Sequence, residues 1–142
     1  MTILPASRHD FRDIAALLER AELPLDGLSA ESLFIVAREP GGPVVGCAAL
    51  EEYASGVLLR SVAVEAPMRG TGLGGRLTRT ALELAARRGA TAAFLLTTTA
   101  GEFFPKFGFA VVERAAVPED IRQSVEFTTA CPATAVVMRA AL

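Results

Sequence analysis

Apolar residues in the first part of this 142-residue chain predict a strand, a helix and a loop. Residues 2–4 have the pattern of a short strand, and Ser7 with Asp10 forms a start signal for a helix that should end near Arg20. The apolar face of that helix recurs at helical spacing, at Phe11, Ile14, Leu18 and Ala21. Residues 22–27 are turn-rich but carry leucines, so we expect this loop to pack near an apolar surface.

Three apolar runs follow, and each predicts a strand. Residues 33–37 and 44–50 are joined across a strong turn signal at residues 39–43, so together they predict a hairpin. Residues 57–64 are rich in branched side chains and lead directly into a glycine-rich segment. This third strand therefore ends where the most distinctive segment of the chain begins.

Helices and strands alternate in the rest of the chain. Residues 75–88 have helical spacing, and residues 92–97 read as a buried strand because their apolar run does not alternate. The remaining expected elements are a short helix over 100–106, a strand over 109–113, a short helix or lid over 118–127 and a strand over 134–138. The order predicts one α/β (α+β) domain, residues 1–142, with a mixed sheet and helices on both faces.

Composition narrows the class of protein. A hydrophobic content of 51% with a charged content of 21% excludes disorder, and no apolar run approaches the ~18 residues of a membrane span. The N-terminus lacks the pattern of a secretory signal, so we expect a cytoplasmic protein. A net charge of −2 argues against nucleic acid as a partner. One histidine and two cysteines leave little from which to build a metal site, and none is expected.

The most informative segment joins the third strand to the helix after it. It consists of Arg69, Gly70, Thr71, Gly72, Leu73, Gly74, Gly75 and Arg76. Gly72 and Gly74 let the backbone adopt positive φ and approach a ligand, and the following helix adds its positive N-terminal end. The segment therefore predicts a phosphate-binding turn, with a turn that holds no ligand as the alternative.

Two known phosphate-binding motifs fit this segment poorly. Gly70 and Gly75 have the spacing of a Walker A loop, but residues 76–77 are Arg-Leu instead of Lys-Ser/Thr. Gly70, Gly72 and Gly75 satisfy the dinucleotide fingerprint, which would make the protein an oxidoreductase. That motif requires an acidic residue about 20 positions later, where residues 94–97 are Phe-Leu-Leu-Thr.

A third motif, Arg-x-x-Gly-x-Gly, is matched by Arg69, Gly72 and Gly74 and resembles the acetyl-CoA pyrophosphate loop of the GNAT acyltransferases. The order of elements is similar to the GNAT layout, with its mostly antiparallel sheet. Residues 96–109 resemble a block of amino-acid N-acetyltransferases, and residues 127–133 resemble the ending of acetyltransferases found with arsenic-resistance genes. The resemblance implies acetyl-CoA as donor and a small-molecule amine as acceptor, either an amino acid or an analogue such as an arsenical one.

The resemblance also implies which residues bind acetyl-CoA. In the family, the strand before the glycine turn splays from its neighbour and offers N–H groups to the pantetheine and thioester. The positions that match are Val62, Ala63 and Val64, followed by the turn from Arg69 to Arg76. Phe104 and Phe107 are expected to pack against the pantetheine or in the core. Families of this kind often form dimers, so a homodimer is among the expected assemblies.

Acceptor-binding candidates lie on several segments. Arg60 places a guanidinium in an apolar strand, where it either binds an oxyanion of the acceptor or pairs internally with Glu51 or Glu52. Thr97 and Thr98 end a strand and either bind the substrate or cap the next helix. Cys131 lies in a segment that would cover the acceptor pocket, although a cysteine before proline is more often structural.

The catalytic acid and base are harder to assign. The candidates for a general base are Glu51, Glu52 and Glu102. Many GNAT enzymes protonate the leaving thiolate with a tyrosine, but here the matching segment offers phenylalanines, and Tyr53 is the single tyrosine. The implied reaction is direct attack of the amine within a ternary complex. A catalytically silent acyl-CoA-binding or regulatory module is the alternative.

Overall fold

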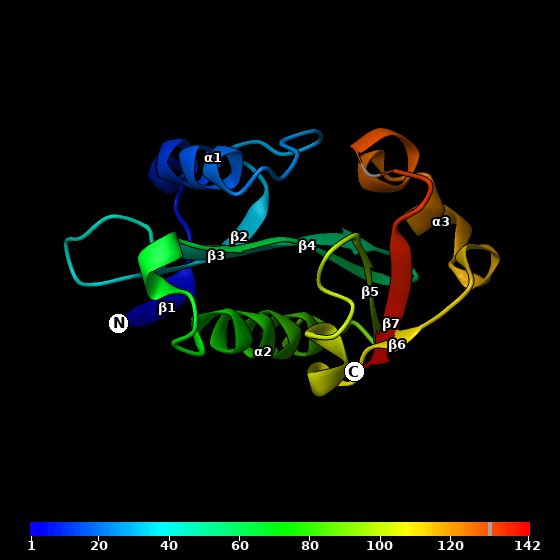
Figure 1. The fold of residues 1–142 in the computed structure, drawn as a ribbon. Coiled ribbons are helices and arrows are strands. Elements are labelled where there is room, and N and C mark those ends of the chain that lie inside the picture. The colour runs from blue at the N-terminus through cyan, green and yellow to red at the C-terminus, as the bar shows by residue number, and fades with distance from the viewer. Residues whose placement is uncertain (131) are drawn as a thin grey trace.

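The computed structural model describes residues 1–130 and 132–142. Its strands form one seven-stranded sheet in the order β1-β2-β3-β4-β5-β7-β6 (Figure 1). Neighbouring strands are antiparallel except β4 and β5, which are parallel, so the predicted mixed and mostly antiparallel sheet is confirmed. The strands are β1 (Thr2–Pro5), β2 (Leu33–Arg38), β3 (Gly46–Tyr53), β4 (Gly56–Val64), β5 (Ala92–Thr97), β6 (Ala110–Val111) and β7 (Val136–Ala141).

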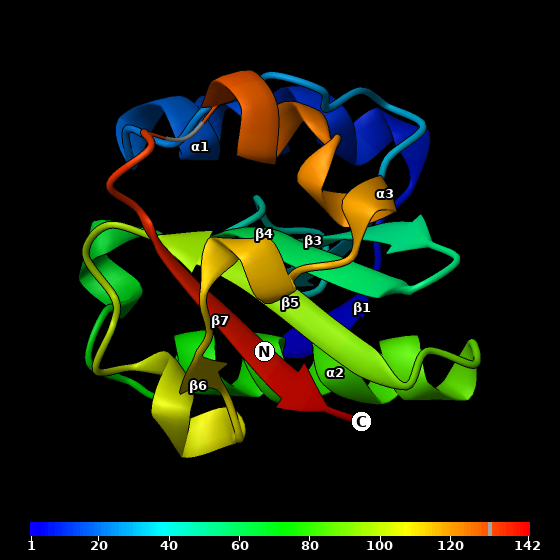
Figure 2. The same ribbon diagram turned by 90° about the vertical axis from the view of Figure 1, so that its right-hand side faces the viewer.

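Helices cover both faces of the sheet, as predicted. Helices α1 (Phe11–Arg20) and α3 (Glu119–Arg122) lie on one face, and α2 (Leu73–Arg87) lies on the other (Figures 1 and 2). Shorter helical turns are Arg8–Asp10, Ala66–Met68, Phe104–Phe107 and Arg114–Ala116, and Glu126–Ala130 forms a π-helical turn. Among the described residues, no helix has the length and apolar character needed to cross a membrane.

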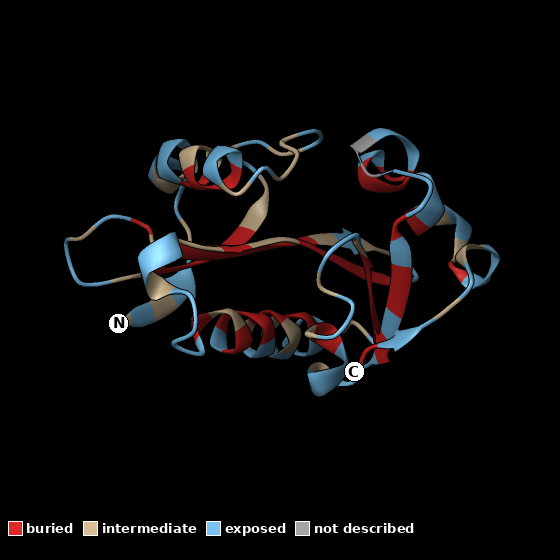
Figure 3. Ribbon diagram, in the orientation of Figure 1, coloured by how far each residue is buried: buried red, intermediate tan, exposed pale blue. Residues whose placement is uncertain are grey.

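The core has a layer on each side of the sheet (Figure 3). Beneath the sheet, Leu77 and Ala81 of α2 pack against strands β2 to β5. Above it, Ile14 of α1 covers one half of the sheet and Ile121 of α3 covers the other. Strand β5 is buried from both sides, which explains why its sequence is apolar without alternation.

Several predicted boundaries were wrong. The helix expected over residues 100–106 is a turn followed by the 3-10 helix Phe104–Phe107. Pro105, near the start of this helix, has no N–H to donate, and Gly108 ends it with a φ of 91°. The strand expected over 109–113 shrinks to β6 at the sheet edge, where it pairs with β7 over Ala110 and Val111.

The remaining differences follow from caps and register. Helix α2 begins two residues earlier than predicted because Gly72, with a φ of 85°, is its N-cap. The last strand is shifted to Val136–Ala141 because it pairs along the whole of β5. The expected lid over 118–127 consists of α3 and a separate π-helical turn.

Strands β4 and β5 diverge in the middle of the sheet. Their ladder has two pairs, Val57 with Ala93 and Leu58 with Phe94. Farther along, β4 contains a bulge at which the register against β3 shifts, and Ser61 in this bulge has a φ of 59°. The sheet therefore opens between its two central strands, on the side toward the glycine turn.

A buried thiol holds the bulge. The Cys47 Sγ donates to the carbonyl oxygen of Ser61 at 3.3 Å. Burial raises the pKa of Cys47 to about 12, so the thiol keeps the proton that it donates. We therefore assign Cys47 a structural role.

Candidate active site

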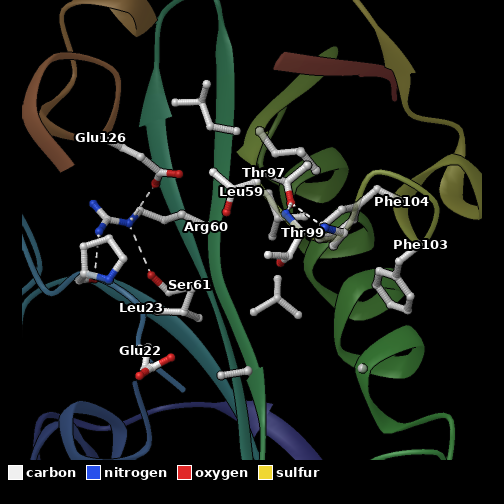
Figure 4. Close-up of a pocket in the computed structure, with 18 of the residues that line it drawn as sticks. Glu22, Leu23, Leu59, Arg60, Ser61, Thr97, Thr99, Phe103, Phe104 and Glu126 are labelled. Atoms are coloured by element: carbon white, nitrogen blue, oxygen red, sulfur yellow. Dashed lines mark hydrogen bonds and ion pairs between the residues drawn. The ribbon is translucent and has the colours of Figure 1, made fainter. Parts of the chain in front are cut away.

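A pocket of about 610 Å³ occupies the opening between β4 and β5. Arg69 and Gly74 of the glycine turn line one part of it, and Glu22 and Glu126 line its wall on either side of Arg60 (Figure 4). Figure 4 shows Glu22, Arg60 and Glu126 on one side, facing Thr97 and the phenylalanines on the other. The other lining residues are Leu23, Pro24, Leu59, Ser61, Val62, Ala63, Val64, Leu95, Leu96, Thr98, Thr99, Ala100, Phe103, Phe104 and Pro132.

The glycine turn has the backbone of an anion site. Gly70 and Gly72 have φ values of 82° and 85°, a region that side chains with a Cβ rarely adopt. A Cβ placed on either glycine would meet no protein atom within 4 Å, so the space above the turn is open. Gly75 has a different role, because a Cβ there would approach the ring of Phe107 at 3.3 Å.

Main-chain donors of this turn are free within the described chain. The first helical bond after it runs from the Arg76 N–H to the Gly72 carbonyl at 3.1 Å. Among the hydrogen bonds of the described residues, none is donated by the N–H groups of residues 70–75. The hydroxyl of Thr71 donates to the Met68 carbonyl at 2.6 Å and shapes the turn from within. Free N–H groups at the head of a long helix favour a bound anion.

Strand β4 offers a further donor at the edge of the pocket. Val64 lies opposite Gly46, next to the pair in which the Glu65 N–H donates to the Val45 carbonyl. Hydrogen-bonded and non-hydrogen-bonded pairs alternate in an antiparallel ladder, so the N–H and C=O of Val64 point away from β3. The C=O accepts from the Nε of Arg69 at 3.2 Å, which ties the turn to the strand.

The phenylalanines expected near the ligand separate into two groups. Phe104 is buried and lines the pocket with Phe103, which it meets edge to face with ring centroids 5.0 Å apart. Phe107 lies outside the pocket lining and packs against Gly75 of α2, with the guanidinium of Arg79 5.0 Å from its ring centroid. Phe107 therefore supports the helix that carries the turn.

Thr97 and Thr98 both line the pocket, but they differ in role. The Oγ1 of Thr97 accepts from the N–H of Ala100 at 2.9 Å and from the N–H of Thr99 at 3.3 Å. This is the capping arrangement that the sequence left open as an alternative. Thr98 is exposed at the pocket wall. Cys131, the third polar candidate for acceptor binding, lies outside the described residues.

Arg60 forms the internal ion pairs that were one of its two expected roles. Its Nη1 lies 3.1 Å from Glu51, and its Nε lies 2.9 Å from Glu126. The other donors reach the carbonyl oxygens of Asp26 at 2.8 Å and Pro24 at 3.2 Å. The side chain is 1% exposed. Arg60 therefore fastens the loop after α1 and the π-helical turn to β4.

The three expected base candidates lie away from the lining of this pocket within the described structure. Glu51 is engaged behind Arg60, and Glu102 lines a neighbouring hollow beside Thr97–Phe103. Glu52 pairs with Arg88 at 2.8 Å on the α2 face of the sheet. The hydrogen bond from Arg88 lowers the pKa of Glu52. Glu52 is therefore the candidate most clearly separated from the pocket, because it lies on the α2 face and is paired with Arg88.

A Glu52→Gln substitution tests this separation. Because the pair is exposed and remote from the pocket, kcat/KM should stay within about twofold of the wild-type value. A lowered carboxylate pKa contributes stability that is present above the unfolded-state pKa and lost as pH falls, so any stability change should fade in acid. Steady-state kinetics and thermal unfolding at two pH values check both. A tenfold loss of kcat/KM in a folded variant would restore Glu52 as a base.

Tyr53 also lies outside the pocket lining. Its hydroxyl donates to Glu51 at 2.7 Å, and burial, followed by this hydrogen bond, raises its pKa to about 12. The phenol is therefore protonated at neutral pH and committed to the Arg60–Glu51 cluster. No tyrosine is among the described residues that line the pocket, so the tyrosine acid of many GNAT enzymes has no counterpart there.

Because Tyr53 is the single tyrosine and the chain has no tryptophan, its titration can be followed without interference. The phenolate absorbance should appear near pH 12 in the folded protein and near the ordinary pKa of about 10 in denaturant. Because the pKa of Tyr53 is higher in the folded than in the unfolded protein, the protonated phenol stabilises the fold. This contribution to the free energy of unfolding is complete below the ordinary pKa and is lost as pH rises through the pKa of the folded protein. A folded-state transition near pH 10 would contradict the buried hydrogen bond.

Sequence reasoning missed two acidic residues of the pocket, Glu22 and Glu126. Glu22 follows the end of α1 with a φ of 57°. Its segment was expected to pack near an apolar surface, but no pattern marked the carboxylate itself. Glu126 lies between Val125 and Phe127, and an acidic residue between apolar neighbours was a signal that the sequence offered. To place Glu22 and Glu126 in the pocket, one must know how the loop after α1 and the π-helical turn pack in the folded protein.

Many solved structures share this fold. The Mycobacterium tuberculosis protein Rv2747, in complex with CoA and NLQ, is 24% identical and has a TM-score of 0.83, covering 100% of this chain and 99% of its own. N-acetylglutamate synthase from Neisseria gonorrhoeae, complexed with coenzyme A and L-arginine, is 26% identical with a TM-score of 0.80. The match covers 99% of this chain but 33% of the synthase. Tetrahymena GCN5 has a TM-score of 0.78 at 14% identity, with 99% and 96% covered.

Sequence comparison identifies the family. No curated protein matches the chain at a significant level. The family model described as an acetyltransferase (GNAT) domain matches residues 30–111, which include the hairpin, β4, the glycine turn, α2 and β5. These are the elements that form most of the pocket. The chain belongs to the GNAT acetyltransferase family, and it is an acyltransferase.

Proposed function

We propose that the protein is an acetyl-CoA-dependent N-acetyltransferase that acts on the amine of an amino acid or an amino-acid-like small molecule. The observation that carries the proposal is the continuous pocket between β4 and β5, which joins the glycine turn to a wall that carries Glu22 and Glu126. A donor with a diphosphate and a thioester fits the first part. A small amine fits the second.

Acetyl-CoA fits the residues around the turn. The open space above Gly70 and Gly72 and the free N–H groups of residues 70–75 suit a diphosphate. Arg69 and Arg76 add guanidinium groups at the same end of α2. The N–H of Val64 is available to an extended chain in the opening between the strands. Three of the similar structures were crystallised with coenzyme A, which supports this assignment.

The proposed reaction is a direct transfer in a ternary complex. The amine nitrogen forms a bond to the thioester carbonyl carbon, the carbon–sulfur bond breaks, and the nitrogen loses a proton as coenzyme A leaves as a thiolate or thiol. Main-chain N–H groups of β4 stabilise the negative charge on the carbonyl oxygen. The apolar wall of Leu59, Leu95 and Phe104 excludes water from the reacting centre. Loss of the proton to solvent suffices for an amine that is partly neutral at neutral pH.

Two likenesses support an amino-acid-like acceptor. One is the similarity to N-acetylglutamate synthase, which was crystallised with L-arginine and with N-acetyl-glutamate in different complexes. The other is the likeness of residues 96–109 and 127–133 to amino-acid and arsenic-associated acetyltransferases. The acceptor panel should therefore include proteinogenic amino acids, their amides and an arsenical amino-acid analogue.

The test is an acetyl-transfer assay with purified protein. Release of free thiol from acetyl-CoA is followed for each amine, and the acetylated product is identified by mass spectrometry. We expect thiol release that requires an amine and equals the product formed. Thiol release without amine dependence would contradict the transferase, and binding of coenzyme A without any turnover would favour the binding module.

A further inference from the structure

The pocket wall that faces Thr97 carries more acidic than basic side chains. Glu22 and Glu126 line it on either side of Arg60 (Figure 4), and Glu51 stands directly behind Arg60. The single guanidinium among these residues is that of Arg60. The other lining cation, Arg69, belongs to the glycine turn.

Arg60 is not available to bind an acceptor carboxylate. Its Nε and Nη1 face Glu126 and Glu51, and its Nη groups also donate to the carbonyl oxygens of Pro24 and Asp26. With 1% of its side chain exposed, any remaining N–H is shielded from the pocket. An acceptor carboxylate placed here would lose its hydration without gaining a guanidinium partner, and it would face acidic neighbours.

Glu22 supplies the accessible negative charge. It is exposed, and no hydrogen bond or ion pair within the described residues involves its carboxylate. Its backbone closes the C-terminus of α1: the Leu23 N–H donates to the Leu18 carbonyl at 3.0 Å, and Glu22 itself takes the left-handed conformation. Glycine is the favoured residue at this position of a helix end. The glutamate thus occupies a site that local backbone preference would give to glycine.

From this arrangement we infer that Glu22 determines acceptor charge, and that the acceptor is an amine without a free carboxylate, such as an amino-acid amide or a diamine. The inference rests on the proposed function and narrows its acceptor class. Glu22 attracts the positive charge of the acceptor at the pocket mouth, and Glu126 with Glu51 keeps the interior unfavourable to carboxylates. Amides and esters of amino acids then bind better than the zwitterions, and glutamate binds worst.

The test compares L-alaninamide with L-alanine in wild-type protein and in Glu22→Gln. The wild type should have the higher kcat/KM for the amide, and Glu22→Gln should reduce that preference by about three- to tenfold. Comparing the preference between the two proteins cancels the difference in amine basicity between the substrates. Glu19→Gln is the matched control, because Glu19 is exposed on the last turn of α1 and lies outside the pocket lining. It should leave the preference unchanged.

A second variant separates the effect of the Glu22 carboxylate from the effect of its backbone conformation. Glu22→Gly relieves the left-handed backbone, so it should raise the Tm while reducing the preference as Glu22→Gln does. A wild type that prefers alanine or glutamate to the amide, or a preference that survives in folded Glu22→Gln, would overturn the inference and leave the transferase intact. Absence of acetylation with every amine would overturn both.

Discussion

Gly72→Val is expected to weaken coenzyme A binding by about 100-fold, the loss that follows from two charge-assisted hydrogen bonds of about 1.5 kcal/mol each. The φ of Gly72 is 85°, and its Cβ would project into the open space above the turn. A branched side chain there would occupy the position that a diphosphate must approach. Isothermal titration with coenzyme A measures the change directly.

Backbone strain alone must be separated from loss of the site, and Gly89 provides the control. Gly89 follows the other end of α2 with a φ of 98°, and a Cβ there also meets no protein atom within 4 Å. Gly89→Val should therefore cost about as much stability as Gly72→Val, about 1–2 kcal/mol for a left-handed residue. Its coenzyme A affinity should match that of the wild type. Equal affinity in both variants would remove the anion site from the turn.

Arg60→Met is expected to produce the largest loss of stability, about 3–5 kcal/mol, because it leaves buried acidic groups without their cation. Glu126 has 5% of its side chain exposed and Glu51 has 20%, so neither regains full hydration. The freed carbonyl oxygens of Pro24 and Asp26 add to the cost. Urea unfolding gives the free energy difference.

The comparison variant is Arg88→Met, which breaks an ion pair in which both side chains are exposed by more than 40%. This change should leave the unfolding midpoint nearly unchanged, since surface pairs contribute little. Adding Glu51→Gln and Glu126→Gln to Arg60→Met should restore much of the lost stability, because the acidic groups are then neutral. Equal effects of Arg60→Met and Arg88→Met would show that the cluster is not a buried ion network.

Much of this fold follows from local sequence. Hydrophobic periodicity predicted α1, the hairpin and β5, and the glycine motif predicted the turn. Each of these signals arises within a few neighbouring residues. Boundaries failed where tertiary pairing decides them. β7 extends along β5, and β6 is cut short at the sheet edge. The helix expected after β5 failed for a local reason, since Pro105 and Gly108 permit only a short 3-10 turn.

The candidate site was harder to predict than the fold because its acidic side chains come from distant segments. Glu22 and Glu126 are more than a hundred residues apart in the sequence. Glu22 reaches the pocket on a loop and Glu126 on a π-helical turn, and no periodicity encodes the path of either segment. Arg60 was flagged by its apolar surroundings, but its partners were divided between β3 and the π-helical turn. Sequence signals identified a buried charge there without identifying what neutralises it.

Because the ladder between β4 and β5 is short, β4 lies in the centre of the sheet but has unpaired main-chain groups like those of an edge strand. After Leu58 and Phe94 the main chain of β4 turns unpaired groups toward the pocket, inside the molecule instead of at its rim. An extended ligand can thus be recognised through peptide groups that every residue carries. Substitutions at positions 62 and 64 can reshape the cavity while this recognition persists, so the scaffold can change its acceptor without rebuilding its donor site.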